Sequence, residues 1–440
     1  MQKITIENFG PISNAEIALN ELLIFIGPQA SGKSIFSKLI YFFKSLRDDM
    51  IIMAWQTDEK NGLSEERFDR EIKTKFVKFF GSTKNMPPFF IQCQYDENTF
   101  LTLTLNEGYV AIQKSSEFQD SFSRIVQSKR EFDKKLVAPP SLNVSHPKFP
   151  SVSELRREGE LKSASFKLLE SEINTLFGEE AEPIFIPASR SLLATLSEQL
   201  TLLDKNNLDF LTEVFIILIT KLKPNYSKSL DEIIKDWQEL TTATINVEYL
   251  YLAKERITDI LKGTYRFDKG EEKIFFNEQE FVKIRLTSSG QQESIWILLI
   301  IFELILNEAK VSALIIEEPE AHLYPIAQKQ MVELMALFLN SNAHRQMIVT
   351  THSPYILTAF NNLIYANEVA NKKRQQVSTI IEPKLWIKKS KVNAFLVEEN
   401  RVSSIMETDE EDFGLIKVEE IDRVSSSINQ DFERLFELDD

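Results

Sequence analysis

The eight residues from 27 to 34 are Gly27-Pro28-Gln29-Ala30-Ser31-Gly32-Lys33-Ser34, which is the pattern GxxxxGKS of a phosphate-binding loop. Glycines in such a loop let consecutive backbone N–H groups turn into one concavity, where they bind phosphate oxygens. The lysine reaches the β- and γ-phosphates, and the serine hydroxyl is a ligand of Mg²⁺. We therefore expect residues 27–34 to bind a nucleoside triphosphate, with Ser34 on the metal.

The residues on either side of this loop support that expectation. The apolar run at 21–26 predicts a buried strand that enters the loop, and residues 34–43 carry apolar side chains at helical spacing. A helix that begins at the loop directs its first N–H groups toward bound phosphate. The order of strand, loop and helix makes an ordinary glycine-rich turn the weaker interpretation.

An acidic motif lies far along the chain, at Leu314-Ile315-Ile316-Glu317-Glu318. Residues 311–316 predict a central strand, and ligands of open α/β sheets bind at the carboxyl ends of strands. The first acid at such a position assists Mg²⁺, usually through water, and a second acid can take a proton from the attacking water. We assign these roles to Glu317 and Glu318. The alternative is a strand that ends in a solvated acidic turn.

Two more segments carry groups suited to such a site. Residues 287–293 are a hydroxyl-rich turn with a glycine, placed directly before a long apolar helix, and a helix N-terminus of this kind binds anions. Residues 346–354 predict another buried strand, which ends in hydroxyl groups and His352. A single histidine after a strand is more often a capping or solvated residue, so it is the order of the motifs that makes this one specific.

In this order the motifs resemble those of ABC-type ATPases of the SMC, RecF and OLD kind. By that resemblance residues 27–34 are the Walker A motif, Leu314–Glu318 is Walker B and His352 is the switch histidine. The signature motif corresponds to Ser288, Ser289, Gly290 and Gln291. Residues 317–325 are similar to the EEPExHLxP run of the OLD-like branch, and residues 351–354 to its THSP run.

Two positions depart from the family pattern. Glu317 stands where most ABC proteins have aspartate, and Ser289 stands where the signature usually has glycine. Neither departure removes a needed group, because the carboxylate and the signature serine Ser288 remain.

The resemblance implies a fold and a mechanism. The fold class is expected to be α/β, an ABC-type P-loop ATPase head with a mixed central sheet, an antiparallel β lobe and a helical insertion. Two protomers are expected to face each other, so that ATP and Mg²⁺ lie between the Walker motifs of one and the signature of the other. Glu318 would polarise the attacking water and His352 would contact the transferred group. We expect an ATPase that forms a homodimer or a higher homo-oligomer.

Four parts are expected along the chain. They are residues 1–114, an N-terminal ATPase lobe with the P-loop and an antiparallel β lobe; 115–265, a mainly helical insertion; 266–370, a C-terminal ATPase lobe with signature, Walker B and switch histidine; and 371–440, a tail. The insertion shows no sustained heptads, so we expect a compact helical domain rather than a long coiled coil. The tail is expected to contain an amphipathic helix over residues 416–438.

Two assignments stay open at the level of sequence. Gln92 and Gln94 are candidates for the Q-loop glutamine of the family, and a solvated strand face explains them equally well. Arg190 ends a segment similar to the IPAxR segment of OLD-like ATPases. It either reaches phosphate or caps a helix.

Composition restricts the compartment and the partners. The 440 residues contain one cysteine and no apolar run of the roughly twenty residues that span a bilayer, which favours a cytoplasmic protein without a membrane segment. The net charge is −15, whereas a dedicated nucleic-acid binder usually shows a basic domain or stripe. Short basic clusters near Lys129, Arg156 and Lys372 allow DNA contact but are more typical of solvated faces.

Residues 353–440 contain no Asp-x-Asp pair between apolar strands, which a Toprim nuclease needs in order to hold two metal ions. We therefore expect no nuclease activity from this subunit and a separate effector protein. The plan resembles ATPase subunits of bacterial anti-phage systems, with the PARIS type as the nearest comparison, in which a Toprim nuclease is held until a phage-encoded trigger protein is sensed. Two alternatives are a RecF- or SMC-like DNA maintenance ATPase and an ATP-gated scaffold with little turnover.

Overall fold

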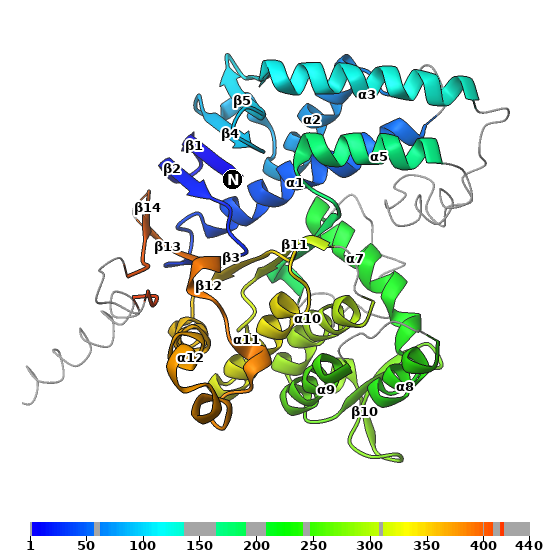
Figure 1. Cartoon of the computed structure of the whole chain (residues 1–440), viewed down its shortest axis with the longest axis vertical. Helices are drawn as coiled ribbons and strands as arrows, with labels where there is room; N and C mark the ends of the chain where they lie inside the picture. The colour runs from blue at the N-terminus through cyan, green and yellow to red at the C-terminus, as the bar shows by residue number, and fades with distance from the viewer. Residues whose placement is uncertain are drawn as a thin grey trace, which may run out of the picture.

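The centre of the molecule is a mixed β-sheet (Figure 1). The computed structural model describes residues 2–56, 62–135, 164–190, 208–240, 247–307, 311–398, 400–407 and 414–417. Within these residues the sheet has six strands, in the spatial order β14 (Arg401–Ser404), β13 (Val392–Glu398), β3 (Leu22–Ile26), β12 (Met347–Thr351), β11 (Val311–Glu317) and β7 (Glu182–Ile186). Neighbouring strands are parallel except at the edge pair β13–β14.

The inner strands are covered on both faces, which explains their continuous apolar sequence. Successive side chains of a strand point to opposite faces of the sheet. In β3, Leu22 and Ile24 therefore belong to one hydrophobic core, and Leu23 and Phe25 belong to the other. The residues of β11 and β12 divide between the two cores in the same way. The sheet is thus the middle layer between two cores.

The first core lies on the side of the P-loop helix α1 (Lys33–Trp55). A second, antiparallel sheet contributes to it, in the order β2 (Ile12–Ala18), β1 (Lys3–Phe9), β4 (Phe90–Gln94), β5 (Phe100–Asn106) and β6 (Tyr109–Lys114). Three more helices complete this side, namely α2 (Glu65–Phe80), α3 (Ser116–Lys135) and α5 (Ala164–Phe177). Figure 1 shows α3 and α5 above α1.

The second core lies on the opposite face of the central sheet. Its helices are α7 (Phe210–Leu222), α8 (Leu230–Leu240), α9 (Val247–Leu261), α10 (Ser289–Leu306), α11 (Pro325–Asn340) and α12 (Pro354–Ser378). A small antiparallel sheet lies beside them, in the order β10 (Phe281–Lys283), β9 (Glu271–Phe275) and β8 (Thr264–Asp268). Short 3₁₀ helices connect these elements, namely η1 (Thr83–Asn85), η2 (Ala188–Arg190), η4 (Lys223–Tyr226), η5 (Ile284–Leu286), η6 (Pro383–Leu385) and η7 (Lys389–Lys391).

Helix α10 is the centre of the second core. It is long and apolar enough to cross a membrane by length and composition, but 78% of it is buried inside the protein. A helix that is apolar around its whole circumference is typical of such a core position. The apolar segment 294–306 is therefore a core helix.

The predicted fold class is confirmed, because the mixed central sheet, the P-loop between β3 and α1 and the antiparallel lobe are all present. The described residues of the range 115–265 are mainly helical, and its helices contribute to both cores. Strand β7 lies inside this range and pairs with β11 at the edge of the central sheet. Helix α5 packs against α1, whereas α9 packs against α10 and α11.

Several strands are not foreseen in the sequence. β8 to β10 are short and rich in charge, and β13 and β14 follow a long helix in the expected tail. In the tail, Ile416 forms a β-bridge with Met406 and is buried. The remainder of the expected amphipathic helix, residues 418–438, lies outside the described residues.

Candidate nucleotide-binding site

Three of the predicted motifs lie at one edge of the central sheet. The strands β3, β12 and β11 are neighbours and run parallel, with Ile26 opposite Thr351 and Glu317 opposite Thr350. The P-loop, the Walker B acids and His352 each follow one of these strand ends. The carboxyl ends of parallel strands are where open α/β sheets bind ligands. We call this set of residues (27–34, 317–320 and 352) the nucleotide edge.

The backbone of the P-loop has the conformation that phosphate binding needs. Gly27 and Gly32 have φ values of 153° and 109°, and Ala30 has a φ of 60°. A Cβ at Gly27 would lie 2.1 Å from the carbonyl oxygen of Val397 in β13, so a larger residue would displace that strand. Pro28, Gln29 and Ala30 are exposed at the outside of the loop.

Lys33 is buried and bound to the loop itself. Its Nζ donates hydrogen bonds to the carbonyl oxygens of Gly27, at 2.8 Å, and Pro28, at 2.7 Å. Burial lowers the pKa of Lys33 to about 8, although the negative charges of Glu318 and Glu320 oppose this shift. A partly desolvated ammonium group that is held by carbonyl groups can exchange them for the oxygens of an anion.

Glu317 is buried against the first turns of α1. Its Oε1 accepts a hydrogen bond from the hydroxyl of Ser37, at 2.8 Å, and its Oε2 accepts one from the N–H of Ala188, at 3.3 Å. Ser37 has no role in our sequence prediction, although it lies one helical turn after Ser34. The hydroxyl-bearing Ser34 is exposed at the start of α1.

The donor groups at the nucleotide edge suit Mg²⁺. They are oxygens, namely the Ser34 hydroxyl, the Glu317 carboxylate and the Oε2 atom of Glu320, which is buried without a hydrogen-bond partner. Within the described residues no three His, Cys, Asp or Glu side chains are grouped to hold a metal by themselves. Mg²⁺ is usually bound by one or two protein groups together with phosphate oxygens and water, which agrees with this donor set.

Glu318 and His352 form a pair at the open side of the edge. Glu318 Oε1 lies 3.3 Å from His352 Nε2, and both side chains are partly exposed, at 38% and 30%. The backbone of Glu318 has a φ of 48°, a left-handed conformation that costs a non-glycine residue about 1 kcal/mol or more. Such strain is concentrated at functional sites.

Glu320 connects Walker B to the end of β12. Its Oε1 accepts hydrogen bonds from the hydroxyl of Thr351 and from the N–H of His352, both at 2.7 Å. The contact positions His352 relative to the acidic turn. Our sequence prediction gives Glu320 no role, although its place three residues after Glu317 in an acidic run is a signal.

The signature residues form the capped N-terminus of α10. Ser288 accepts a hydrogen bond from the N–H of Gln291, at 3.3 Å, and Gln291 accepts one from the N–H of Ser288, at 3.1 Å. Gly290 packs against the carbonyl oxygen of His322, since a Cβ there would lie only 2.6 Å away. The side chains of Ser288 and Ser289 are exposed. The contacts of the signature turn therefore run to α10 itself, to the turn after Walker B and, through Gln291 Nε2, to the carbonyl oxygen of Leu261 at the end of α9.

The two open assignments have different outcomes. Gln92 donates to the Thr102 hydroxyl, and Gln94 donates to the carbonyl oxygen of Glu97. These bonds lie within the antiparallel lobe, which favours the strand-face interpretation. The side chain of Arg190 donates its hydrogen bonds to backbone carbonyl groups of Pro187, Walker B and α10.

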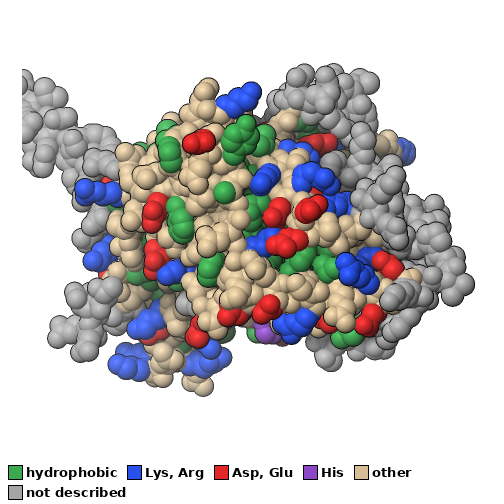
Figure 2. All heavy atoms as spheres, turned by 90° about the horizontal axis from the view of Figure 1, so that it is seen from above, with side chains coloured by type: hydrophobic (Ala, Val, Ile, Leu, Met, Phe, Trp, Pro, Cys, Tyr) green, Lys and Arg blue, Asp and Glu red, His purple; other side chains and the backbone are tan. Residues whose placement is uncertain are grey.

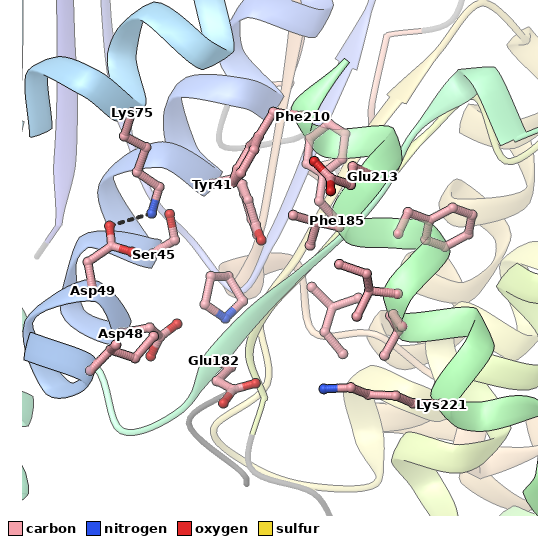
Figure 3. A pocket seen from close by; sticks show the side chains of 17 residues that line it. Tyr41, Ser45, Asp48, Asp49, Lys75, Glu182, Phe185, Phe210, Glu213 and Lys221 are labelled. Atoms are coloured by element: carbon pink, nitrogen blue, oxygen red, sulfur yellow. Dashed lines mark hydrogen bonds and ion pairs between the residues drawn. The ribbon is translucent and has the colours of Figure 1, made fainter. Parts of the chain in front are cut away.

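A separate hollow of about 260 Å³ lies between α1, β7 and α7 (Figure 3). One part is acidic, with Asp48, Asp49 and Glu182, and Asp49 pairs with Lys75 at 2.5 Å. Burial and the nearby charge of Glu182 raise the pKa of Asp48 to about 7. Helix α7 contributes an apolar wall that includes Phe210. We call this hollow the α1–α7 cavity. Its acidic part is unsuited to phosphate.

Several basic side chains on the side of α1 and the antiparallel sheet form ion pairs. In Figure 2 the Lys and Arg side chains are interspersed with Asp and Glu over the visible face. Lys114 lies 2.9 Å from Glu65 and 2.5 Å from Asp69, and Lys129 pairs with Asp133. These pairs agree with solvated helix and strand faces rather than with a continuous phosphate-binding stripe.

Residues 1–357 match the family model of the AAA ATPase domain. The chain belongs to this AAA ATPase family. The matched range of the AAA ATPase domain includes the P-loop, the signature turn, Walker B and His352. ATP binding through the P-loop follows from this membership. No curated protein matches the sequence.

Solved structures with a similar arrangement are SMC head domains. An SMC head bound to the C-terminal winged-helix domain of ScpA is 12% identical, with a TM-score of 0.37 over 93% of this chain and 97% of that one. The SMC head domain from Thermotoga maritima is 12% identical, with a TM-score of 0.34 over 92% and 98%. An SMC head with an extended coiled coil, bound to the C-terminal domain of ScpA from Pyrococcus furiosus, is 11% identical, with a TM-score of 0.35 over 98% and 100%. These identities and TM-scores are too low to support an argument. The assignment of the fold therefore relies on the strand order described above.

Proposed function

We propose that this AAA ATPase is a nucleotide-gated subunit in bacterial anti-phage defence. Two copies bind ATP and Mg²⁺ between them, hydrolyse the ATP and thereby control a separate effector protein, a Toprim-type nuclease in the cytoplasm. The observation that carries the ATPase part is the Glu318–His352 pair, which lies at a strand end next to the P-loop. A general base needs this kind of position, close to the γ-phosphate and still open to water.

The proposed roles follow from the contacts of each group. The P-loop N–H groups and Lys33 bind the phosphates, and Lys33 leaves the carbonyl groups of Gly27 and Pro28 in order to do so. Ser34 and Glu317 would hold Mg²⁺, Glu317 through water, and the bound ion would supply positive charge for the phosphate oxygens. Glu318 accepts the proton of the attacking water, while His352 holds the carboxylate and contacts the transferred group.

A second copy is needed because the signature turn of a protomer makes its contacts away from the P-loop of that same protomer. Ser288 and Ser289 are exposed at the N-terminus of α10, where the helix dipole attracts anions. Exposed apolar side chains lie next to the motifs in sequence, with Leu286 at 69%, Tyr324 at 77% and Tyr355 at 55%. Burial of such side chains against a second copy would support an ATP-dependent homodimer or higher homo-oligomer.

The separate effector is proposed from the chemistry available after His352. Two-metal phosphodiester cleavage needs several carboxylates that converge on metal ions about 4 Å apart. Residues 353–440 supply no Asp-x-Asp pair for this purpose, and Glu317 and Glu318 are assigned to the nucleotide. A phage-encoded trigger protein and a nuclease partner would then be recognised by surfaces outside the nucleotide edge.

The test combines turnover, assembly and partners. The purified chain should hydrolyse ATP with Mg²⁺ faster than Lys33→Ala, should dimerise with ATP when Glu318 is replaced by Gln, and should leave DNA uncut with Mg²⁺ or Mn²⁺. Purification of the tagged chain with its genomic neighbours, with and without ATP, should recover a nuclease. Dimerisation on double-stranded DNA would favour a DNA maintenance ATPase instead, and ATP-dependent assembly without turnover would favour a scaffold.

A further inference from the structure

Arg190 is a buried arginine between the two halves of the proposed catalytic machinery. It follows β7 in the 3₁₀ helix η2, and it is 3% exposed. Its guanidinium donates hydrogen bonds to four backbone carbonyl oxygens, which belong to Glu293 at 3.0 Å, Pro187 at 3.1 Å, Glu317 at 2.6 Å and Glu318. Burial of a guanidinium costs free energy unless its N–H groups make hydrogen bonds. These four bonds therefore hold the Arg190 side chain in one position.

The four carbonyl groups belong to three different segments. Glu317 and Glu318 are in the Walker B turn, Pro187 is in the connection after β7, and Glu293 is in the first turns of α10, just after the signature. One side chain therefore connects the acids of Walker B to the helix that carries the signature. A second contact supports the same connection, since His322 Nε2 lies 3.3 Å from Glu293 Oε1.

The bond to Glu318 matters most, because Glu318 has a left-handed backbone. Its N–H donates to the carbonyl oxygen of Thr350, and its own carbonyl oxygen accepts from both Arg190 and the N–H of Ala321, so the strained peptide is held on both sides. Without Arg190 the carbonyl oxygen keeps only the local bond from Ala321, and the turn can relax toward an ordinary conformation, which would move the carboxylate away from His352. A displacement of about 1 Å at a reacting group can reduce a rate about a hundredfold.

We propose that Arg190 is a positioning residue, which fixes the Glu318 carboxylate for water activation and couples it to the signature helix. The inference rests on the proposed ATPase function. In the composite arrangement Glu318 acts on the ATP of its own protomer and the signature acts on the ATP of the other. Arg190 is then the mechanical connection between the two sites of a dimer, although it touches neither nucleotide.

The chain offers a matched control at the other end of α10. Arg345 is also 3% exposed, and it donates to the carbonyl oxygens of Phe338, at 3.0 Å, and Leu304, at 2.6 Å. These bonds connect the C-terminal parts of α11 and α10. Loss of Arg345 should therefore disturb the same helix without disturbing the Walker B turn.

The experiment compares Arg190→Lys and Arg190→Met with Arg345→Lys and Arg345→Met in the full chain. Wild-type turnover above that of Lys33→Ala is measured first, because its absence would refute the ATPase function itself rather than the role of Arg190. The readouts are kcat, KM, ATP affinity by calorimetry and the melting temperature. Arg190→Lys should lower kcat by about 30- to 100-fold and leave ATP affinity within about threefold, because the P-loop is untouched. Arg345→Lys should lower the melting temperature about as much as Arg190→Lys does, and it should keep kcat within about twofold of the wild-type value.

Equal kcat values for the two lysine variants would overturn the proposal. A parallel loss of ATP affinity and kcat in Arg190→Lys would overturn it too, since a positioning role affects turnover selectively. Failure of both Arg190 variants to fold, while both Arg345 variants fold, would assign Arg190 to general stability and would also overturn it. The Met variants measure the effect of losing every N–H donor of the side chain. Arg190→Met should lose at least as much turnover as Arg190→Lys.

Discussion

Helix α1 contributes residues to two regions of opposite character. Its first residue, Lys33, belongs to the nucleotide edge, and its later turns line the α1–α7 cavity with Asp48 and Asp49. Burial shifts a pKa toward the neutral form in both places, to about 8 for Lys33 and about 7 for Asp48. The nucleotide edge has a loop with positive φ values and the Glu318–His352 pair, whereas the cavity combines acids with an apolar wall. A hollow with a perturbed pKa is therefore insufficient to define a catalytic site.

The largest difference between the two regions should appear when one carboxylate in each is neutralised. Glu318→Gln keeps the shape of the side chain but cannot accept a proton, so kcat should fall by about 100- to 1,000-fold while ATP binding persists. The matched change Glu213→Gln, in the α1–α7 cavity, should leave kcat unchanged. Wild-type turnover in Glu318→Gln, measured by phosphate release, would mean that another group activates the water.

A second contrast uses one lysine from each region. Lys33→Ala removes the cation that binds the γ-phosphate, so ATP affinity should fall by about a hundredfold. Lys75→Ala removes the partner of Asp49 and should leave ATP affinity within about twofold. Calorimetric titration with ATP and Mg²⁺ decides the matter, and near-normal binding by a folded Lys33→Ala variant would refute the P-loop assignment.

The pH dependence of ATP binding gives a smaller, graded effect. Lys33 has a lowered pKa of about 8 in the free protein, so it is charged below pH 8 and becomes neutral above it. Bound ATP favours the charged form, and affinity should therefore fall by about twofold from pH 7 to 8 and weaken by up to about tenfold per unit above pH 8. Titrations at pH 7, 8, 9 and 9.5 test this, and a flat profile to pH 9.5 would show that Lys33 stays charged.

The smallest effect is expected at Asp48, and only on stability. Its folded pKa of about 7 lies above the value of an unfolded aspartate, so the folded state binds more protons and the protein loses stability as the pH rises from about 4 to 7. Asp48→Asn cannot ionise and should be more stable than wild type at pH 8 by about 1–2 kcal/mol, with unchanged ATP turnover. Denaturant unfolding at pH 5 and pH 8 checks the sign. A variant that is less stable than wild type at pH 8 would contradict it.

The sequence alone determined the P-loop, the two acids of Walker B and the strands that lead to them. These features are local, because glycine freedom, a lysine–serine pair and short apolar runs act within about ten residues of one another. The capped start of α10 at Ser288 is local for the same reason, and the structure has it. These local motifs can be recognised without knowing which distant segment of the chain packs against them.

Only the tertiary structure decided which distant groups meet. Ser37 bonds to Glu317 across 280 positions, and Arg190 bonds to the Glu317 carbonyl across 127. Strand β7 contains a strand-like apolar run at 184–186, but only the structure shows that it pairs with β11 in the central sheet. A hydrogen bond to a backbone carbonyl leaves no trace in the identity of the accepting residue, so the sequence around Glu318 contains no sign of Arg190. The arrangement of the catalytic turn therefore depends on pairings that exist only once the sheet has formed.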